Sequence, residues 1–306
     1  MEKTYIFGHK NPDTDTITSS LVMADFERKL GNTEVEACRL GDINKETEYV
    51  LNYIGIEAPK YIENLEDGES VILVDHANPK ESIDNLDNLV IKKVVDHHKL
   101  GLSTAYPLFY RAEPVGCTET VLYKLYKEYG FEIDKKIAML MLSAIISDTL
   151  LLKSPTTTND DINAVEELAK IADIDYKTYG LEMLKAGTDL SSYTPAEILK
   201  IDAKETEIKG KKIIVAQVNT ASIPEVMTLK EDLEKEINNM IADKKLDLFM
   251  LLITDIVNSN SQTISLGNSA NIIEKSYNVK LENNTAFLPG IVSRKKQVIP
   301  VLSENA

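Results

Sequence analysis

Cysteine and long apolar runs are both scarce in this sequence. Only Cys38 and Cys117 occur among 306 residues, too few and too far apart for a disulfide framework or a zinc ribbon. The longest apolar stretch, residues 246–256, is interrupted by charged residues such as Asp247, and residues 1–7 contain no signal-peptide core. We therefore expect a cytoplasmic protein with no membrane partner.

Basic residues are also outnumbered. The chain has 34 lysines and arginines against 49 acidic residues, a net charge of -15 at pH 7. Such a chain as a whole repels a nucleic-acid backbone, so we expect no nucleic-acid partner. An anionic substrate would have to be bound by a local basic cluster or through bound cations.

The apolar content, 43% of the chain, is ample for packed cores, and the length suggests about two domains. Short apolar runs in the first hundred residues alternate with helix-compatible segments, and between Cys117 and Gly187 apolar residues recur at helical spacing. This pattern predicts an α/β domain with a mainly parallel sheet flanked by helices. The predicted strands are residues 4–7, 35–38, 71–74 and 91–95.

A polar, Ser/Thr-rich stretch that ends at Pro195 indicates a linker. We expect an N-terminal domain over residues 1–187, a linker or hinge over 188–195, and a smaller C-terminal α+β domain over 196–306. In the second domain the pattern predicts a hairpin over 205–216, a helix over 229–244, and strands over 246–253 and 263–266.

Three clusters of aspartate and histidine follow predicted strands. The carboxyl ends of parallel strands meet at one edge of a sheet, so the three clusters should converge on one crevice. Asp148, which ends an apolar stretch over 139–146, is a fourth candidate. The clusters are residues 8–15, 75–76 and 96–98.

Each candidate also has a structural interpretation. Asp15 could cap a helix that begins near Thr16, Asp75 could be a turn residue, and His9 could be an ordinary hydrogen-bonding side chain. Taken together, four or five aspartates in one crevice would repel one another unless cations neutralised them.

The ligand types indicate which cation. Imidazoles among carboxylates, here His9 and His97, favour manganese or a similar ion, and the lack of cysteine argues against structural zinc. The ligands are too many for one ion, so we expect two metals that share a carboxylate. Such a centre produces a bridging hydroxide for in-line attack on phosphorus, which indicates hydrolysis of a phosphoester or phosphoanhydride.

A basic run over residues 293–296 is the concentrated positive spot in this acidic chain. By itself it could be a solvated turn. Beside a metal hydrolase centre, Arg294 would offer a planar fork and Lys295 a point charge for phosphate oxygens. Lys204, by contrast, carries no signal of its own in the sequence.

With these motifs the sequence resembles the family II inorganic pyrophosphatases of the DHH phosphoesterase superfamily. The likeness spans essentially the whole chain and includes several ordered motifs. They are Gly8-His9-Lys10-Asn11-Pro12-Asp13-Thr14-Asp15-Thr16, Val74-Asp75-His76, Val95-Asp96-His97-His98, Glu113-Pro114-Val115-Gly116-Cys117-Thr118, Ser147-Asp148-Thr149-Leu150 and Ser293-Arg294-Lys295-Lys296-Gln297.

The resemblance implies a role for each matching residue. One manganese would be held by His9, Asp13 and Asp75. The second would be held by Asp15, Asp75, His97 and Asp148, with Asp75 as the bridge and Asp96 orienting the neighbouring histidines. The residues implied to contact substrate are His98, Lys204, Ser293, Arg294 and Lys295, and all of these except Ser293 are expected to be catalytic.

The same resemblance implies the reaction and its setting. The enzyme would be an inorganic diphosphatase (EC 3.6.1.1 type) that splits pyrophosphate into two phosphates. Its active site would lie in a cleft between the metal-binding domain and a DHHA2-type substrate domain. It would use two Mn²⁺ ions per subunit, with Co²⁺ as a substitute and further Mg²⁺ or Mn²⁺ arriving with substrate, and it would form a homodimer.

Two alternatives belong to other classes. DHH phosphodiesterases that act on short oligonucleotides or cyclic dinucleotides typically carry a Gly-Gly-Gly-His motif, whereas this chain contains no Gly-Gly pair and has the basic run instead. A catalytically silent metal-binding protein should have lost ligand or clamp positions, and none is lost here.

Overall fold

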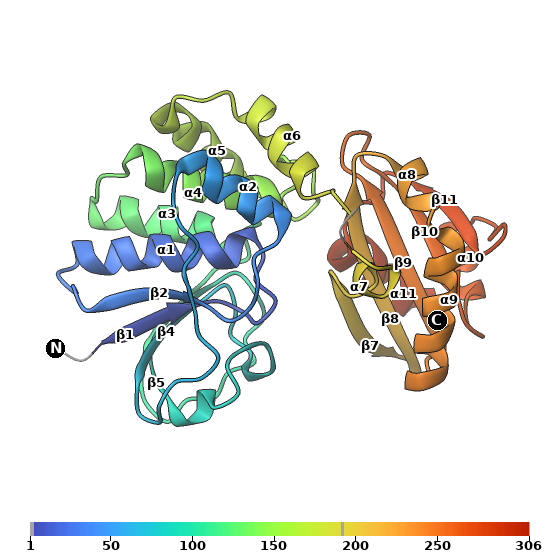
Figure 1. Cartoon of the computed structure of the whole chain (residues 1–306), viewed down its shortest axis with the longest axis horizontal. Coiled ribbons are helices and arrows are strands. Elements are labelled where there is room, and N and C mark those ends of the chain that lie inside the picture. The colour runs from blue at the N-terminus through green and yellow to red at the C-terminus, as the bar shows by residue number, and fades with distance from the viewer. Residues whose placement is uncertain (1–2, 191–192, 306) are drawn as a thin grey trace. The chain divides into compact units, whose positions relative to one another are not determined.

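The computed structural model describes residues 3–190 and 193–305. The chain divides into two compact units, Met1–Ala186 and Gly187–Ala306 (Figure 1). Part of the predicted linker, residues 191 and 192, lies outside the described residues.

The N-terminal unit is built on a six-stranded sheet of order β3-β2-β1-β4-β5-β6, in which every pairing is parallel. The four strands predicted from apolar runs are confirmed. The two edge strands were missed because they are short and largely exposed, so they carry no apolar run. The strands are β1 (Thr4–Phe7), β2 (Val35–Arg39), β3 (Lys60–Tyr61), β4 (Ser70–Val74), β5 (Val90–Asp96) and β6 (Phe109–Ala112).

Helices cover one face of this sheet (Figure 1). Helix α4 is buried over Ile137–Ile146 because it is apolar all round. The opposite face of the sheet packs Phe7, Leu73 and Val94 against residues that include Ile83 and Leu86 of the segment between β4 and β5. The helices are α1 (Thr14–Lys29), α2 (Lys45–Ile54), α3 (Thr118–Tyr129), α4 (Lys135–Asp148), α5 (Asn159–Ala172) and α6 (Tyr176–Ala186), with short 3-10 helices η1 (Pro79–Glu81) and η2 (Leu86–Asn88).

The C-terminal unit contains a five-stranded sheet of order β11-β10-β9-β8-β7. Strands β8 and β9 run parallel and the other neighbours antiparallel. Lys209 and Gly210 both have positive φ, 49° and 77°, and close the predicted hairpin in a two-residue turn. The strands are β7 (Ala203–Ile208), β8 (Lys211–Thr220), β9 (Leu248–Asp255), β10 (Asn260–Leu266) and β11 (Thr285–Pro289).

Both faces of this second sheet are covered. Along β9, Phe249 and Leu251 enter one core together with Leu233 of α9, whereas Met250 enters the other with Ile273 of α10. No helix within residues 3–190 and 193–305 is both long and apolar enough to cross a membrane. The helices here are α7 (Pro195–Ile198), α8 (Ile223–Met227), α9 (Lys230–Lys244), α10 (Asn271–Tyr277), the π-helical turn η3 (Arg294–Val298) and α11 (Ile299–Asn305).

Candidate metal centre

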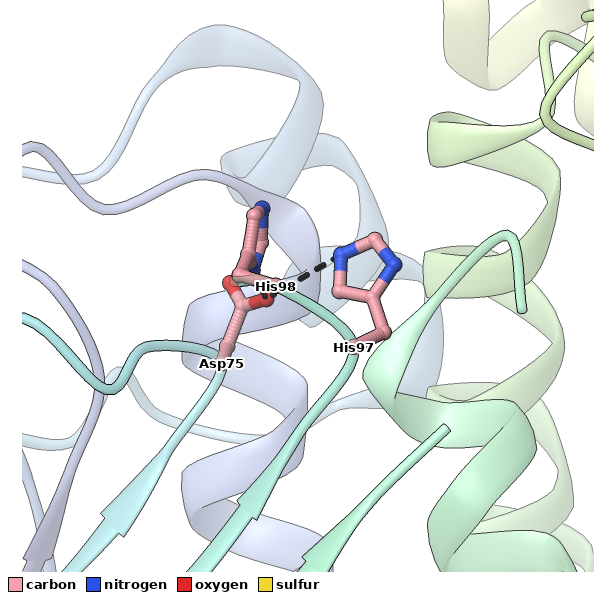
Figure 2. Close-up of side chains that lie close together, drawn as sticks. All are labelled: Asp75, His97 and His98. Atoms are coloured by element: carbon pink, nitrogen blue, oxygen red, sulfur yellow. Dashed lines mark ion pairs between the residues drawn. The ribbon is translucent and has the colours of Figure 1, made fainter. Parts of the chain in front are cut away.

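The predicted clusters meet at the carboxyl edge of the six-stranded sheet. The loop after β1 carries His9. Asp75 follows β4, and His97 and His98 follow β5 (Figure 2). Asp148 is the last residue of α4 and lies beside them, with its Oδ2 atom 3.7 Å from His97 Nε2. The convergence expected from parallel strand ends is therefore present.

Asp75 occupies the centre of the site. Its backbone is left-handed, with φ at 58°, and the residue is only 1% exposed. The hydroxyls of Thr16 and Thr118 donate to its two carboxylate oxygens, at 2.6 and 3.0 Å. One oxygen then lies 3.4 Å from His9 Nε2 and the other 3.6 Å from His97 Nε2. The carboxylate is thus held between two histidines, one on each side.

Around this carboxylate the donor atoms form two groups. Within each group the candidate ligand atoms lie within 4.8 Å of one another, a separation that suits ligands of a single ion at bond lengths of about 2 Å. A third set of candidate ligand atoms at the same spacing consists of Asp75, His97 and His98. The two groups are His9, Asp13 and Asp75, and Asp15, His97 and Asp148.

His97 is oriented for ligation. Its Nδ1 atom lies 3.1 Å from the carbonyl oxygen of Val115, and because a carbonyl can only accept, Nδ1 carries the proton. In the neutral ring the lone pair of Nε2 then faces Asp75 at 3.6 Å and Asp148 at 3.7 Å. An acceptor nitrogen facing carboxylates requires a cation between them, so the donor set fits a metal ion.

His98 has different surroundings although it is adjacent in the chain. Its Nδ1 atom lies 3.0 Å from Asp96 Oδ1, and its side chain is 38% exposed, against 8% for His97. The same oxygen of Asp96 accepts the backbone N–H groups of both histidines, at 2.8 and 3.0 Å. Burial raises the pKa of Asp96, but its bonds to His98 hold that pKa below the ordinary value. Asp96 thus fixes the turn that carries the two rings, whose centroids lie 4.1 Å apart.

The electrostatics of the site show a shortage of positive charge. Burial, reinforced by the charges of Asp15 and Asp13, raises the pKa of Asp75 to about 7. Burial and the same neighbouring carboxylates raise the pKa of Asp148 well above its usual range. Burial lowers the pKa of His9, but the carboxylates of Asp13 and Asp75 outweigh it and raise that pKa well above the ordinary value. Protons thus supply part of the positive charge that cations would bring.

The capping interpretation of Asp15 is wrong. Asp13 is the N-cap of α1, and its Oδ1 atom accepts the N–H of Thr16 at 2.9 Å. Its other oxygen lies 3.4 Å from His9, so one residue serves both the helix and the site. Asp15 is 1% exposed and accepts from the hydroxyl of Ser19 and the backbone N–H of Thr118.

Several supporting groups were missed in the sequence. Glu46 in the first turn of α2 accepts from the hydroxyls of Thr14 and Ser147, at 2.7 and 2.5 Å, which ties α1 to the end of α4. Thr16 and Thr118 lie inside the quoted motifs, but nothing there distinguishes them from ordinary cap residues. No acidic cluster follows the strand that precedes Glu46. The one feature of the sequence that could have indicated a role for Glu46 is its place at the start of the helix after that strand.

Comparison with known proteins decides the family. Residues 3–145 match the DHH family, N-terminal domain, and residues 181–305 match the DHHA2 domain. The chain is 52% identical over 306 residues to the manganese-dependent inorganic pyrophosphatase of Bacillus subtilis, covering 99% of each chain. The chain belongs to the family II inorganic pyrophosphatases. The resemblance predicted from the motifs is confirmed.

A solved family II structure supports the fold as well. The crystal structure of a Methanococcus jannaschii protein assigned to the family II inorganic pyrophosphatases matches with a TM-score of 0.83 and 41% identity, covering 99% of both chains. The predicted α/β class with a mainly parallel sheet is confirmed, and the C-terminal part contains a second, mixed sheet.

The predicted basic residues lie in the part of the chain that matches the family's DHHA2 domain. Lys204 is on edge strand β7, and Ser293 immediately precedes the turn that begins at Arg294. Ser293 is 7% exposed, and its hydroxyl accepts the N–H of Lys296. Arg294 Nη1 lies 2.7 Å from Asp202 Oδ1, two residues before Lys204. Asp202 thus links the start of the strand that carries Lys204 to the guanidinium.

Proposed function

We propose that this chain hydrolyses pyrophosphate to two phosphates as an inorganic diphosphatase. The observation that carries the proposal is the position of Asp75, whose two oxygens each face a different histidine-containing group of ligands. A shared carboxylate between two ion sites is the arrangement that favours displacement at phosphorus. The names of the two relatives described above agree with this reaction.

The residues proposed to hold two manganese ions are those predicted from the motifs. Two ions bound there would lower the pKa of water toward neutrality and polarise the phosphoryl group. Co²⁺ would serve as a substitute, and additional Mg²⁺ or Mn²⁺ would arrive with the substrate. The ligand sets are His9, Asp13 and Asp75 for one ion, and Asp15, Asp75, His97 and Asp148 for the other.

The proposed substrate contacts come from a different set of side chains. Arg294 binds phosphate oxygens through its planar fork, and Lys204 and Lys295 add positive charge to a chain whose net charge is -15. Ser293 contributes a hydroxyl. His98 contacts substrate or the leaving phosphate, because its Nδ1 is held by Asp96 while a large part of its ring is exposed.

The remaining predictions concern the cellular location, the oligomeric state and the roles of the domains, and we propose them together with this function. We infer a cytoplasmic homodimer in which residues 1–187 carry the metals, 188–195 serve as a hinge and 196–306 bind substrate. The phosphodiesterase alternative is disfavoured because the chain lacks a Gly-Gly pair and because its relatives carry pyrophosphatase names.

One assay tests the proposal. Phosphate release is measured from pyrophosphate, tripolyphosphate, ATP and a short oligonucleotide, each with manganese, cobalt, zinc or magnesium. We expect pyrophosphate with manganese or cobalt to give the highest rate. Cleavage of the oligonucleotide in preference to pyrophosphate would favour the phosphodiesterase, and no turnover of any substrate would favour the silent metal-binding protein.

A further inference from the structure

The backbone that leads to Arg294 is held by side chains rather than by a neighbouring strand. The Gln297 carboxamide accepts from the N–H groups of Val292 and Ser293, at 2.9 and 3.1 Å. The hydroxyl of Ser261 on β10 donates to the carbonyl of Ile291 at 2.7 Å. The segment over residues 290–294 therefore depends on its side-chain partners for its position.

Gln217 on β8 makes the contacts nearest to Arg294. Its Nε2 atom donates to the carbonyl of Val292 at 3.0 Å, and its Oε1 atom accepts the N–H of Arg294 at 3.1 Å. The same Nε2 lies 3.0 Å from Thr254 Oγ1 on β9, which fixes the carboxamide against the sheet. One side chain thus supplies a donor and an acceptor to two backbone groups, as a neighbouring strand would.

The other end of Arg294 is held as well. Its Nη1 atom donates to the backbone carbonyl of Asp202 at 2.6 Å and lies 2.7 Å from that residue's carboxylate. The backbone N–H of Gln217 donates to the same carbonyl at 2.9 Å. Gln217 and Asp202 therefore belong to one hydrogen-bonded group that contacts Arg294 at its backbone and at its guanidinium. The arginine side chain is only 15% exposed, which leaves it little freedom.

We propose that Gln217 is a positioning residue for Arg294. The inference rests on the proposed function, in which Arg294 binds phosphate oxygens. A bidentate fork is effective only when its position is set to a fraction of an ångström, so loss of the group that fixes its backbone should weaken catalysis without removing any charge. Gln217 lies outside the basic motif, about eighty residues earlier in the chain.

The chemistry of the contact explains why a carboxamide is needed. Glutamate at position 217 would keep an acceptor for the N–H of Arg294 but would place a negative oxygen against the carbonyl of Val292. Leucine would leave both backbone groups without this partner. Both variants should reduce kcat/KM for pyrophosphate by about 10- to 100-fold. Much of the loss should be in kcat, because a misplaced fork loses more of its interaction with the transition state than with the bound substrate.

The experiment compares Gln217→Glu and Gln217→Leu with the matched control Gln262→Glu. Gln262 is also a half-buried strand residue, and none of the hydrogen bonds described for residues 290–294 includes it. Hydrogen exchange of a peptide that spans residues 290–297 is measured beside steady-state kinetics and manganese affinity. We expect faster exchange and lower kcat/KM in both Gln217 variants, unchanged manganese affinity, and wild-type values in the control.

A double-mutant cycle separates positioning from general stability. In an Arg294→Ala background, Gln217→Leu should cost little further activity, because the side chain that it positions is already gone. Equal losses in both backgrounds would overturn the proposal, as would wild-type exchange at residues 290–297 in both Gln217 variants. Should Gln217→Leu fail to fold, Gln217→Glu provides the same cycle. If the wild-type chain does not hydrolyse pyrophosphate, the proposed function fails, whereas the exchange data still test the contact itself.

Discussion

The Nδ1 atom of His97 lies 3.1 Å from the carbonyl oxygen of Val115. This bond couples the ring of His97, a proposed metal ligand, to a loop that other buried groups hold in place. The next residue, Gly116, donates its N–H to both oxygens of Asp161, at 3.1 and 3.0 Å, and Asp161 is fully buried at the start of α5. The orientation of His97 thus depends in part on a carboxylate of α5 that anchors the loop.

The two adjacent histidines should have separable functions. His97→Gln should weaken manganese affinity by about 10- to 100-fold, because an amide is a poorer ligand than an imidazole directed at the carboxylates. His98→Gln should retain manganese and lose turnover. Metal titration beside steady-state kinetics distinguishes the two. Equal metal-binding defects in both variants would contradict this assignment.

Gly116→Ala should weaken the metal site from a distance. A Cβ at position 116 would lie 2.8 Å from Asp161 Oδ2 and 2.8 Å from Thr149 Cγ2, closer than such atoms approach in proteins. Both side chains that this Cβ would meet are fully buried, so we expect the loop that orients His97 to move and relieve the clash. We expect a loss of about 1–3 kcal/mol in stability together with lower manganese affinity.

Gly101→Ala is the matched control for this experiment, because its Cβ would meet the nearest atom at 3.4 Å, an ordinary contact. Thermal melts and metal titration of both variants check the expectation. Manganese affinity at the wild-type value in Gly116→Ala would show that the loop does not position the ligand.

Removal of metal should destabilise the N-terminal unit, and more so at higher pH. In the metal-free protein the folded pKa of Asp75, about 7, lies above its ordinary 3.8, so folding favours its protonated form. This contribution to stability is fully present below about pH 4 and is lost as pH rises toward 7. The raised pKa values of Asp148 and His9 act in the same direction. Manganese replaces those protons, so its stabilising effect should grow with pH.

Thermal melts at pH 5 and pH 8, with chelator and with manganese restored, measure this effect. We expect the melting temperature to rise by about 5 °C or more on metal addition at pH 8 and by less at pH 5. An equal rise at both pH values would contradict the competition between protons and metal.

Arg294→Ala should lower kcat/KM by about 10²- to 10³-fold while leaving manganese affinity unchanged. Lys296→Ala is the charge-matched control. It removes the same charge from the same turn, η3, but Lys296 is not among the proposed substrate contacts, so we expect less than a threefold effect. Steady-state kinetics of both variants provide the check, and similar losses in both would indicate a general effect of charge.

The sequence was informative where local chemistry is strong. Apolar runs indicated β1, β2, β4 and β5, most clearly β4, which is buried at every position because a central parallel strand is covered on both faces. They could not indicate β3 or β6, since an exposed edge strand is stabilised by its pairing rather than by its side chains. The aspartate and histidine clusters predicted a metal centre because that many carboxylates cannot share a crevice without cations.

The sequence by itself determined the residue types at the strand ends, and hence the chemistry that this protein can perform. Only the tertiary structure decided which atoms meet. It placed His9 beside Asp75, directed the lone pair of His97 by a bond to Val115, and brought Gln217 to Arg294. Contacts between residues far apart in the chain depend on strand order and packing, and the local pattern of a sequence does not encode them.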